Sequence, residues 1–389
     1  MEDAKREGTA RRESRSMAGE PLRLFTSRSG DKRSSTSSSA LYSGTERSSS
    51  TPTSAARLYW PRVDNEDDED SSDDAAYTTR AKSSKSKAGR LFRNALSSLG
   101  RSRPKNSKFQ GYYKNGILLN NPKEKDRTAM QHRAILEIWD GFLYLCPLEL
   151  PANVLDVGTG SGLWALELAA KSPKSQVIGV DIEPIRPAYR LPNCTFKSMD
   201  ITQPWTVGTK SFDFIHVRML GDLAPNIREE AFKSMHTHLN PGGWIECTEW
   251  IMRLRSGNRS TRGTRFEEWF RGVEKGLRIF GSSVDYPREW AKLMRAQGFQ
   301  DVTVWKTPIP LNSWPPGKRL KQIGSMMTFN AQTFVDSVTK PVFDQALGWP
   351  QEEIDRLISD CHNEIPDTSS HGYMDMITVF GQKPRGTSS

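Results

Sequence analysis

The chain has 389 residues, of which 35% are hydrophobic and 26% charged, and its formal net charge is +9. Most of this charge lies in residues 1–108, which hold 22 Lys and Arg against 15 Asp and Glu. The rest of the chain is nearly neutral, which argues against a domain that holds nucleic acid through a broad basic face.

The N-terminal part, residues 1–108, is rich in Ser, Arg and acidic residues and includes low-complexity runs at 33–39 and 64–70. Such segments cannot bury enough apolar surface to offset the entropy lost on ordering. We therefore expect a disordered tail. Residues 80–108 carry ten Lys and Arg and no acidic residue. A basic, flexible segment is typical of nuclear import signals, although it can also be a merely solvated linker. We expect a protein of the nucleus, the cytoplasm or both.

Residues 109–389 are predicted to form one α/β domain. It opens with a helix at 126–146 and continues with alternating strands and helices. Near-continuous apolar strands that alternate with helices predict a doubly wound, mostly parallel sheet. We predict strands at 153–157, 176–180, 195–199, 212–217, 244–254, 301–308 and 374–380, and helices at 161–171, 227–239, 266–280 and 288–297.

Two further features of the domain are predicted from local composition. Residues 240–243, Asn-Pro-Gly-Gly, are a helix stop and a turn. An insertion at 311–370, before the last strand, is expected to be helical around 318–344 and 351–363. At that point in the chain it should cap the carboxyl ends of the strands, where ligands bind in such folds.

The clearest motif is a glycine-rich turn within residues 154–164, VLDVGTGSGLW. Glycines between a strand and a helix let a ligand touch the backbone, and the first N–H groups of the helix face it. A dinucleotide-binding turn would have a third glycine at position 163, but this residue is Leu163, which disfavours a nicotinamide oxidoreductase. Asp156 precedes the turn, where an acid would repel phosphate but suit a cationic ligand.

Two more carboxylates follow the next two strands. Asp181 stands 25 residues after Asp156, at the height where an acid accepts hydrogen bonds from both hydroxyls of a ribose. Asp200 follows the third strand and is placed to hold an adenine amino group, with Ile201 against the ring. The three elements together indicate a cofactor that contains adenosine.

With these motifs the sequence resembles the class I S-adenosylmethionine (SAM)-dependent methyltransferases. More narrowly, it is similar to the fungal LaeA-like group, which includes regulators of secondary metabolism and tailoring enzymes. The resemblance covers about 109–385 and rests on residues 155–165, 204–205, 212–218 and 239–246. It implies the class I sheet of seven strands, with an antiparallel last strand. The segment ahead of the domain matches the group at 126–127 and 131–132 but departs from it at 121–122 and 128–129, which puts a cofactor contact from there in doubt.

The resemblance implies S-adenosyl-L-methionine as the cofactor. The candidate cofactor contacts are Asp156, Gly158, Thr159, Gly160, Ser161, Gly162, Asp181, Ile182, Asp200, Ile201 and His216. His216 is also the candidate catalytic base, with Arg218 and Asp222 nearby, but it is equally a candidate for packing on the cofactor. A base is needed only if the acceptor must lose a proton. Glu249 and Trp250 are candidates to line the acceptor pocket.

No metal site is predicted. The pair His236 and His238 would point in different directions on a helix, and none of the four cysteines forms a CxxC pair. No apolar run approaches the roughly 20 residues needed to span a bilayer, so we expect no membrane partner and no direct nucleic-acid readout by the domain.

The leading hypothesis is a methyltransferase that tailors a fungal secondary metabolite or regulates such pathways. The methyl acceptor, a small molecule or a protein, cannot be identified from the motifs. The alternative is a SAM-binding nuclear scaffold that acts through regulatory protein partners with little or no turnover.

Overall fold

The computed structural model describes residues 122–182, 189–207, 211–223 and 225–386, so the predicted tail and basic segment lie outside the described residues. The described residues form a seven-stranded sheet in the order β3-β2-β1-β4-β5-β7-β6. The pairs from β3 to β5 are parallel, and β7 is antiparallel to both β5 and β6. The predicted fold class and the antiparallel last strand are confirmed.

The elements have the following bounds. The strands are β1 Asn153–Val157, β2 Gln176–Asp181, β3 Cys194–Ser198, β4 Phe212–Arg218, β5 Leu239–Arg255, β6 Gln300–Pro310 and β7 Tyr373–Gln382. The helices are α4 Pro122–Ile138, α5 Leu163–Lys171, α6 Pro225–His238, α7 Arg265–Ile279, the 3-10 helix η1 Tyr286–Glu289, α8 Trp290–Ala296, α9 Lys318–Gln345 and α10 Gln351–Glu364.

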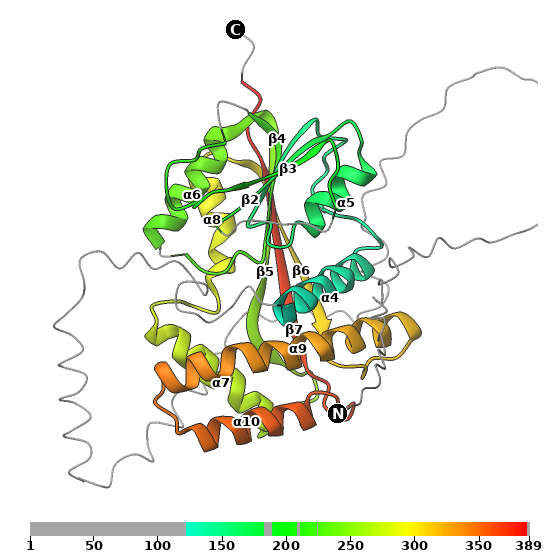
Figure 1. Ribbon diagram of the computed structural model, residues 1–389, viewed down its shortest axis with the longest axis vertical. Helices are drawn as coiled ribbons and strands as arrows, with labels where there is room; N and C mark the ends of the chain where they lie inside the picture. Colours follow the sequence, from blue (N-terminus) through cyan, green and yellow to red (C-terminus); the bar gives the residue numbers. More distant parts are fainter. Residues whose placement is uncertain (1–121, 183–188, 208–210, 224, 387–389) are drawn as a thin grey trace, which may run out of the picture. The chain divides into compact units, whose positions relative to one another are not determined.

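Helices cover both faces of the sheet (Figure 1). Helices α6 and α8 lie on one face, where their apolar side chains join a core cluster with β1, β4 and β5. Helix α5 lies on the other face, where Trp164 and Leu168 pack with Phe214 of β4 and Phe380 of β7. The central strands β1 and β4 are therefore buried on two sides, which explains their near-continuous apolar sequences, whereas the edge strands β3 and β6 are largely exposed.

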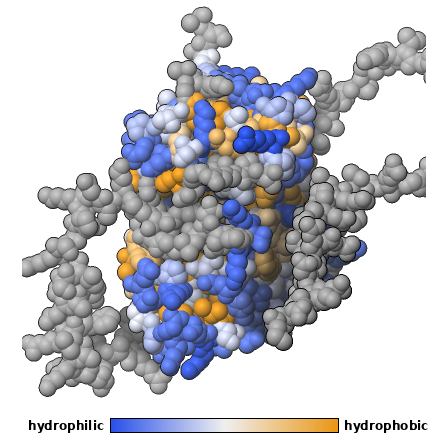
Figure 2. Space-filling model, viewed as in Figure 1, coloured by the Kyte–Doolittle hydropathy of each residue, from blue (hydrophilic) through white to orange (hydrophobic). Residues whose placement is uncertain are grey.

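A third apolar cluster lies at one end of the long strands β5, β7 and β6. Helices α4, α7, α9 and α10 gather there (Figure 1) and share this cluster with Trp250 and Met252 of β5. Trp269 of α7 is almost fully buried, and its indole N–H donates to Thr339 Oγ1 of α9 at 2.7 Å. The outer surface in Figure 2 is mainly hydrophilic with scattered apolar areas. The insertion at 311–370 thus supplies α9 and α10 to a helical layer, and its role as a substrate cap stays a prediction.

Two local predictions were wrong. Helix α4 ends at Ile138, not at residue 146, because Asp140 and Gly141 have positive φ angles of 53° and 82°. Phe142, within the predicted helix, lies beyond its end and is 52% exposed. Strand β5 begins at Leu239 and takes in the predicted turn at 240–243. The reason is local pairing, since the backbone of Gly242 and Gly243 hydrogen-bonds with that of Lys383, directly after β7.

No helix in the described ranges is long and apolar enough to cross a membrane.

Candidate functional site

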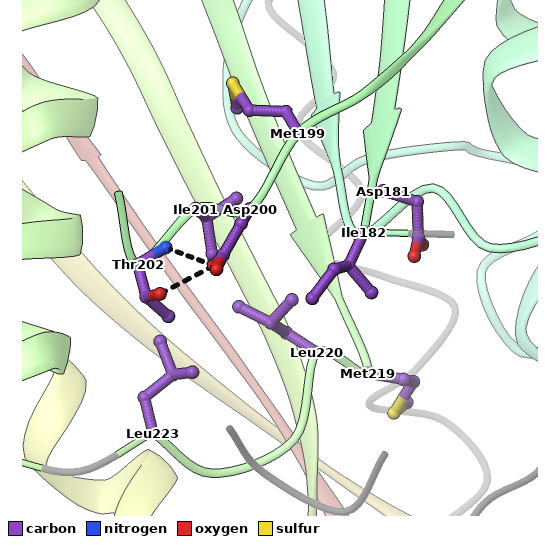
Figure 3. Close-up of a pocket in the computed structure, with 10 residues that line it drawn as sticks. Asp181, Ile182, Met199, Asp200, Ile201, Thr202, Met219, Leu220 and Leu223 are labelled. Atoms are coloured by element: carbon purple, nitrogen blue, oxygen red, sulfur yellow. Dashed lines mark hydrogen bonds between the residues drawn. The ribbon is translucent and has the colours of Figure 1, made fainter. Parts of the chain in front are cut away.

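A hollow that is partly open to solvent lies at the carboxyl ends of β1, β2 and β4. Figure 3 shows the side chains that line it, which come from the turn after β1, the end of β2, the segment after β3 and the loop after β4. The lining residues are Gly158, Asp181, Ile182, Met199, Asp200, Ile201, Thr202, Met219, Leu220 and Leu223. Five of the eleven candidate cofactor residues are therefore together in one place, although their role as cofactor contacts stays a prediction.

The glycine-rich turn borders the hollow through Gly158. Gly158, Gly160 and Gly162 have φ angles of 69°, 55° and 79°, a region that L side chains rarely adopt. A Cβ added at Gly160 would meet no described atom within 4 Å, so this backbone faces open space. Asp181 Oδ2 accepts a hydrogen bond from the Gly160 N–H at 2.8 Å, which ties the end of β2 to the turn. Ser161 is half-buried in the same turn.

Asp200 is fixed by its own backbone turn. Its Oδ1 accepts hydrogen bonds from Thr202 N at 2.9 Å and from Thr202 Oγ1 at 2.6 Å (Figure 3). Such a turn orients the carboxylate. Between Asp200 and Asp181 the lining is apolar, and Ile182 and Leu220 face each other there (Figure 3). The hollow thus has acidic groups at its edge and an apolar middle.

Asp156 and His216 do not line the hollow but lie beneath the turn, with exposed fractions of 3% and 1%. His216 Nδ1 is 2.7 Å from Asp156 Oδ1, and Thr159 Oγ1 donates to Asp156 Oδ2 at 2.6 Å. The ring of His216 stacks on Trp164 with centroids 3.6 Å apart. Burial lowers the pKa of His216, so the neutral ring donates from Nδ1 to Asp156.

A polar chain that the sequence did not predict continues from the end of β4 to α5. Arg218 Nη2 donates to His132 Nδ1 at 2.7 Å, and His132 Nε2 donates to Glu167 Oε2 at 2.8 Å. Lys171 forms an ion pair with Glu167 at 2.8 Å. These contacts lower the pKa of Glu167 to about 2, the hydrogen bond from His132 being the largest cause. Only one signal in the sequence indicated this polar chain. Gln131 and His132 match the segment ahead of the domain in the LaeA-like group.

Glu249 and Asp222 hold the loop after β4 in place. Glu249 accepts hydrogen bonds from Gly221 N at 3.1 Å and from Trp250 N at 3.0 Å, and burial raises its pKa. Asp222 accepts from Ser282 Oγ at 2.8 Å and forms an ion pair with Arg228. This loop carries Met219, Leu220 and Leu223 into the lining of the hollow. Both carboxylates are thus engaged in fixing the loop, whether or not an acceptor also reaches them.

The described residues contain no group of three or more His, Cys, Asp or Glu side chains that could hold a metal ion. His236 packs edge-on against Phe299, whereas His238 stacks on Trp205. The two rings therefore have different neighbours and do not converge.

Comparison with known proteins identifies the family. Residues 130–304 match the family described as "Methyltransferase domain". The chain is 30% identical over 283 residues to the methyltransferase pytC of Aspergillus terreus. This match covers 71% of this chain and 86% of pytC. The chain belongs to the class I methyltransferases. The sheet order with its antiparallel β7 agrees with this assignment.

Two further similarities were found. The secondary metabolism regulator laeA of Aspergillus fumigatus is 27% identical to this methyltransferase over 316 residues, 76% of this chain and 83% of laeA. A structure of phosphoethanolamine N-methyltransferase 2 of Haemonchus contortus in complex with S-adenosyl-L-methionine is 18% identical, with a TM-score of 0.36. The match covers 67% of this chain and 52% of that chain.

Proposed function

We propose that this methyltransferase uses SAM as the methyl donor and binds it in the hollow beside the glycine-rich turn. The observation that carries the proposal is the lining of the hollow. Two carboxylates, Asp181 and Asp200, stand at its edge around an apolar middle, and the backbone of Gly160 faces open space where a Cβ would otherwise project. A cationic ligand with a ribose and an apolar ring fits this arrangement.

Each part of the lining has a distinct task in the proposal. Asp181 accepts hydrogen bonds from the ribose hydroxyls, while Asp200 holds the adenine amino group beside Ile201. The backbone of Gly158 and Gly160 contacts the methionine part of the cofactor. SAM, when bound, supplies an electrophilic methyl group on a sulfonium. The protein then contributes mainly by orienting the two reactants and excluding water.

His216 serves in this proposal as a positioning residue rather than as the catalytic base. Its side chain is 1% exposed, stacked on Trp164 and hydrogen-bonded to Asp156. Its Nε2, the nitrogen that could accept a proton, is buried without a hydrogen-bond partner among the described residues, and His216 does not line the hollow. Its observed contacts instead fix Asp156, which through Thr159 supports the turn from below.

The biological role that we propose follows from the relatives. It is a place in fungal secondary metabolism, either tailoring a metabolite or regulating its pathways. The name of laeA, secondary metabolism regulator, indicates such a place for that protein, and pytC is named a methyltransferase. The acceptor is a small molecule or a protein that enters beside the helical layer of α7, α9 and α10. Metabolite profiling of a deletion strain separates the two roles, since a tailoring enzyme alters one compound and a regulator alters many.

The first test is binding of SAM to the purified chain, measured as a shift in melting temperature. A ligand that binds only the native state stabilises it by about 2.7 kcal/mol at a hundredfold excess over Kd, so we expect a clear upward shift. No shift with millimolar SAM, together with a shift with NADH, would contradict the proposal. Turnover of SAM to S-adenosylhomocysteine in a cell extract then separates an enzyme from a scaffold that binds without turnover.

A second test is the substitution Asp181→Ala, which removes the proposed ribose acceptor. Hydrogen bonds to a charged group contribute roughly 1.5–3 kcal/mol each, so the Kd for SAM should rise tenfold or more, as measured by calorimetry. The control is Asp344→Ala, an exposed position in α9, which should leave the Kd unchanged. Equal affinities in the two variants would show that Asp181 does not hold the ribose.

A further inference from the structure

Arg218, the last residue of β4, has an incomplete set of partners. Its Nη2 donates to the neutral ring of His132 at 2.7 Å. Its Nη1 is buried and has no hydrogen-bond partner among the described residues. Nor does any carboxylate in the described ranges form an ion pair with it. The residue is half-buried, and the buried part of its guanidinium has only a neutral imidazole beside it, which leaves its charge unpaired.

The acidic groups around Arg218 are committed elsewhere. Both oxygens of Asp156 are taken by His216 and Thr159, and Glu167 binds His132 and Lys171. Glu246 accepts two backbone N–H groups through Oε2, and burial raises its pKa to about 7. Burial in turn lowers the pKa of Arg218 to about 10. The surroundings therefore lack an anion that directly faces this cation.

The sheet register places Arg218 beside the proposed cofactor site. Asp156 is level with His216 and Val157 with Val217, so Arg218 comes level with Gly158, the first residue of the turn. The next residue, Met219, lines the hollow. Residues two apart in a strand face the same way, so Arg218 lies on the His216 side of the sheet, where α4 and α5 supply its neighbours.

The strand ends on the two sides of the glycine-rich turn differ in charge. Asp181 and Asp200 lie at the ends of β2 and β3, and Arg218 ends β4, with β1 and its glycine turn between them. An adenosine held by the two acids leaves the amino-acid end of SAM to extend over the turn toward β4. That end carries an α-carboxylate, the kind of anion that a guanidinium binds with charge-assisted hydrogen bonds.

We propose that Arg218 binds the α-carboxylate of SAM through Nη1, and that His132 and Glu167 orient its guanidinium. The inference rests on the proposed use of SAM and adds a specificity residue to that site. His132 is suited to the orienting task, because burial lowers its pKa and the neutral ring both accepts from Arg218 and donates to Glu167.

The test compares two ligands that differ only in this carboxylate, SAM and decarboxylated SAM, with the full chain and its variants. For the wild-type chain we expect the Kd of decarboxylated SAM to be at least tenfold higher, a difference of about 1.4 kcal/mol. In Arg218→Gln the two Kd values should converge to within about threefold, because SAM weakens while decarboxylated SAM changes little. Arg218→Lys should keep part of the preference, since it retains the charge.

The control is Arg253→Gln, which removes a partly exposed arginine of β5 that is paired with Glu274 and Asp285, and it should keep the wild-type ratio. If Arg218 has only a structural role, both ligands should bind Arg218→Gln more weakly, and the ratio of their Kd values should stay as in the wild-type chain. This outcome would overturn the inference. If neither ligand binds the wild-type chain, the proposed function itself fails. If SAM binds the wild-type chain without preference over its decarboxylated form, only the role of Arg218 is lost.

Discussion

Gly160→Val is expected to raise the Kd for SAM at least a hundredfold while the fold persists. The φ angle of Gly160 is 55°, where a β-branched residue is strained by roughly 1–3 kcal/mol. Its side chain would project into the open space beside the hollow, where no described atom lies within 4 Å of a built Cβ. The valine should therefore reduce the affinity for SAM more than it reduces the stability of the fold.

A matched control separates backbone strain from loss of the site. Gly348, between α9 and α10, also has a positive φ angle, 68°, and a Cβ there meets no described atom within 4 Å. Gly348→Val should lower the melting temperature by a similar amount and keep the wild-type Kd for SAM in calorimetry. Wild-type affinity in Gly160→Val would show that the cofactor does not approach this turn.

The residues at the sheet edge that carries the hollow could be predicted from sequence, because the local sequence pattern shows where each strand ends. An apolar run fixes each parallel strand, and the residue that follows it must emerge at the carboxyl edge. Asp181, Asp200 and the glycine turn therefore came together in the structure as their positions in the sequence indicated. The apolar residues of the loop after β4, Met219, Leu220 and Leu223, carried no comparable signal.

Long-range polar contacts could not be predicted in this way. Arg218 meets His132 across 86 positions of the chain, and Glu246 meets the backbone of Cys146 across 100. Helical periodicity places His132 on a face of α4 but does not say what that face covers. The end of α4 was missed for a different reason. Asp140 and Gly141, which both have positive φ angles, are a turn signal in the sequence, but the apolar residues that follow them favoured a longer helix.

Glu246 should make the stability of the chain fall between pH 5 and pH 8. Its side chain is fully buried in β5, and its Oε2 accepts the N–H groups of Leu145 at 2.8 Å and Cys146 at 2.7 Å. Burial raises its pKa from 4.5 to about 7 in the folded state. The folded chain thus holds this proton more tightly than the unfolded chain does. The associated stability is present below pH 4.5 and is lost as the pH rises to about 7.

The expected loss from this group is about 2–3 kcal/mol, at about 1.36 kcal/mol for each pKa unit. Glu246→Gln keeps an oxygen for the two N–H groups but carries no titrating proton, so its free energy of unfolding should change less over this range. Denaturant unfolding at pH 5 and pH 8 measures the difference, with the exposed Glu353→Gln of α10 as the control. Relative to wild type, Glu246→Gln should gain about 2–3 kcal/mol on going from pH 5 to pH 8, and Glu353→Gln should gain none. Parallel pH profiles for the wild-type chain and Glu246→Gln would mean that the folded chain ionises Glu246 as readily as the unfolded chain does.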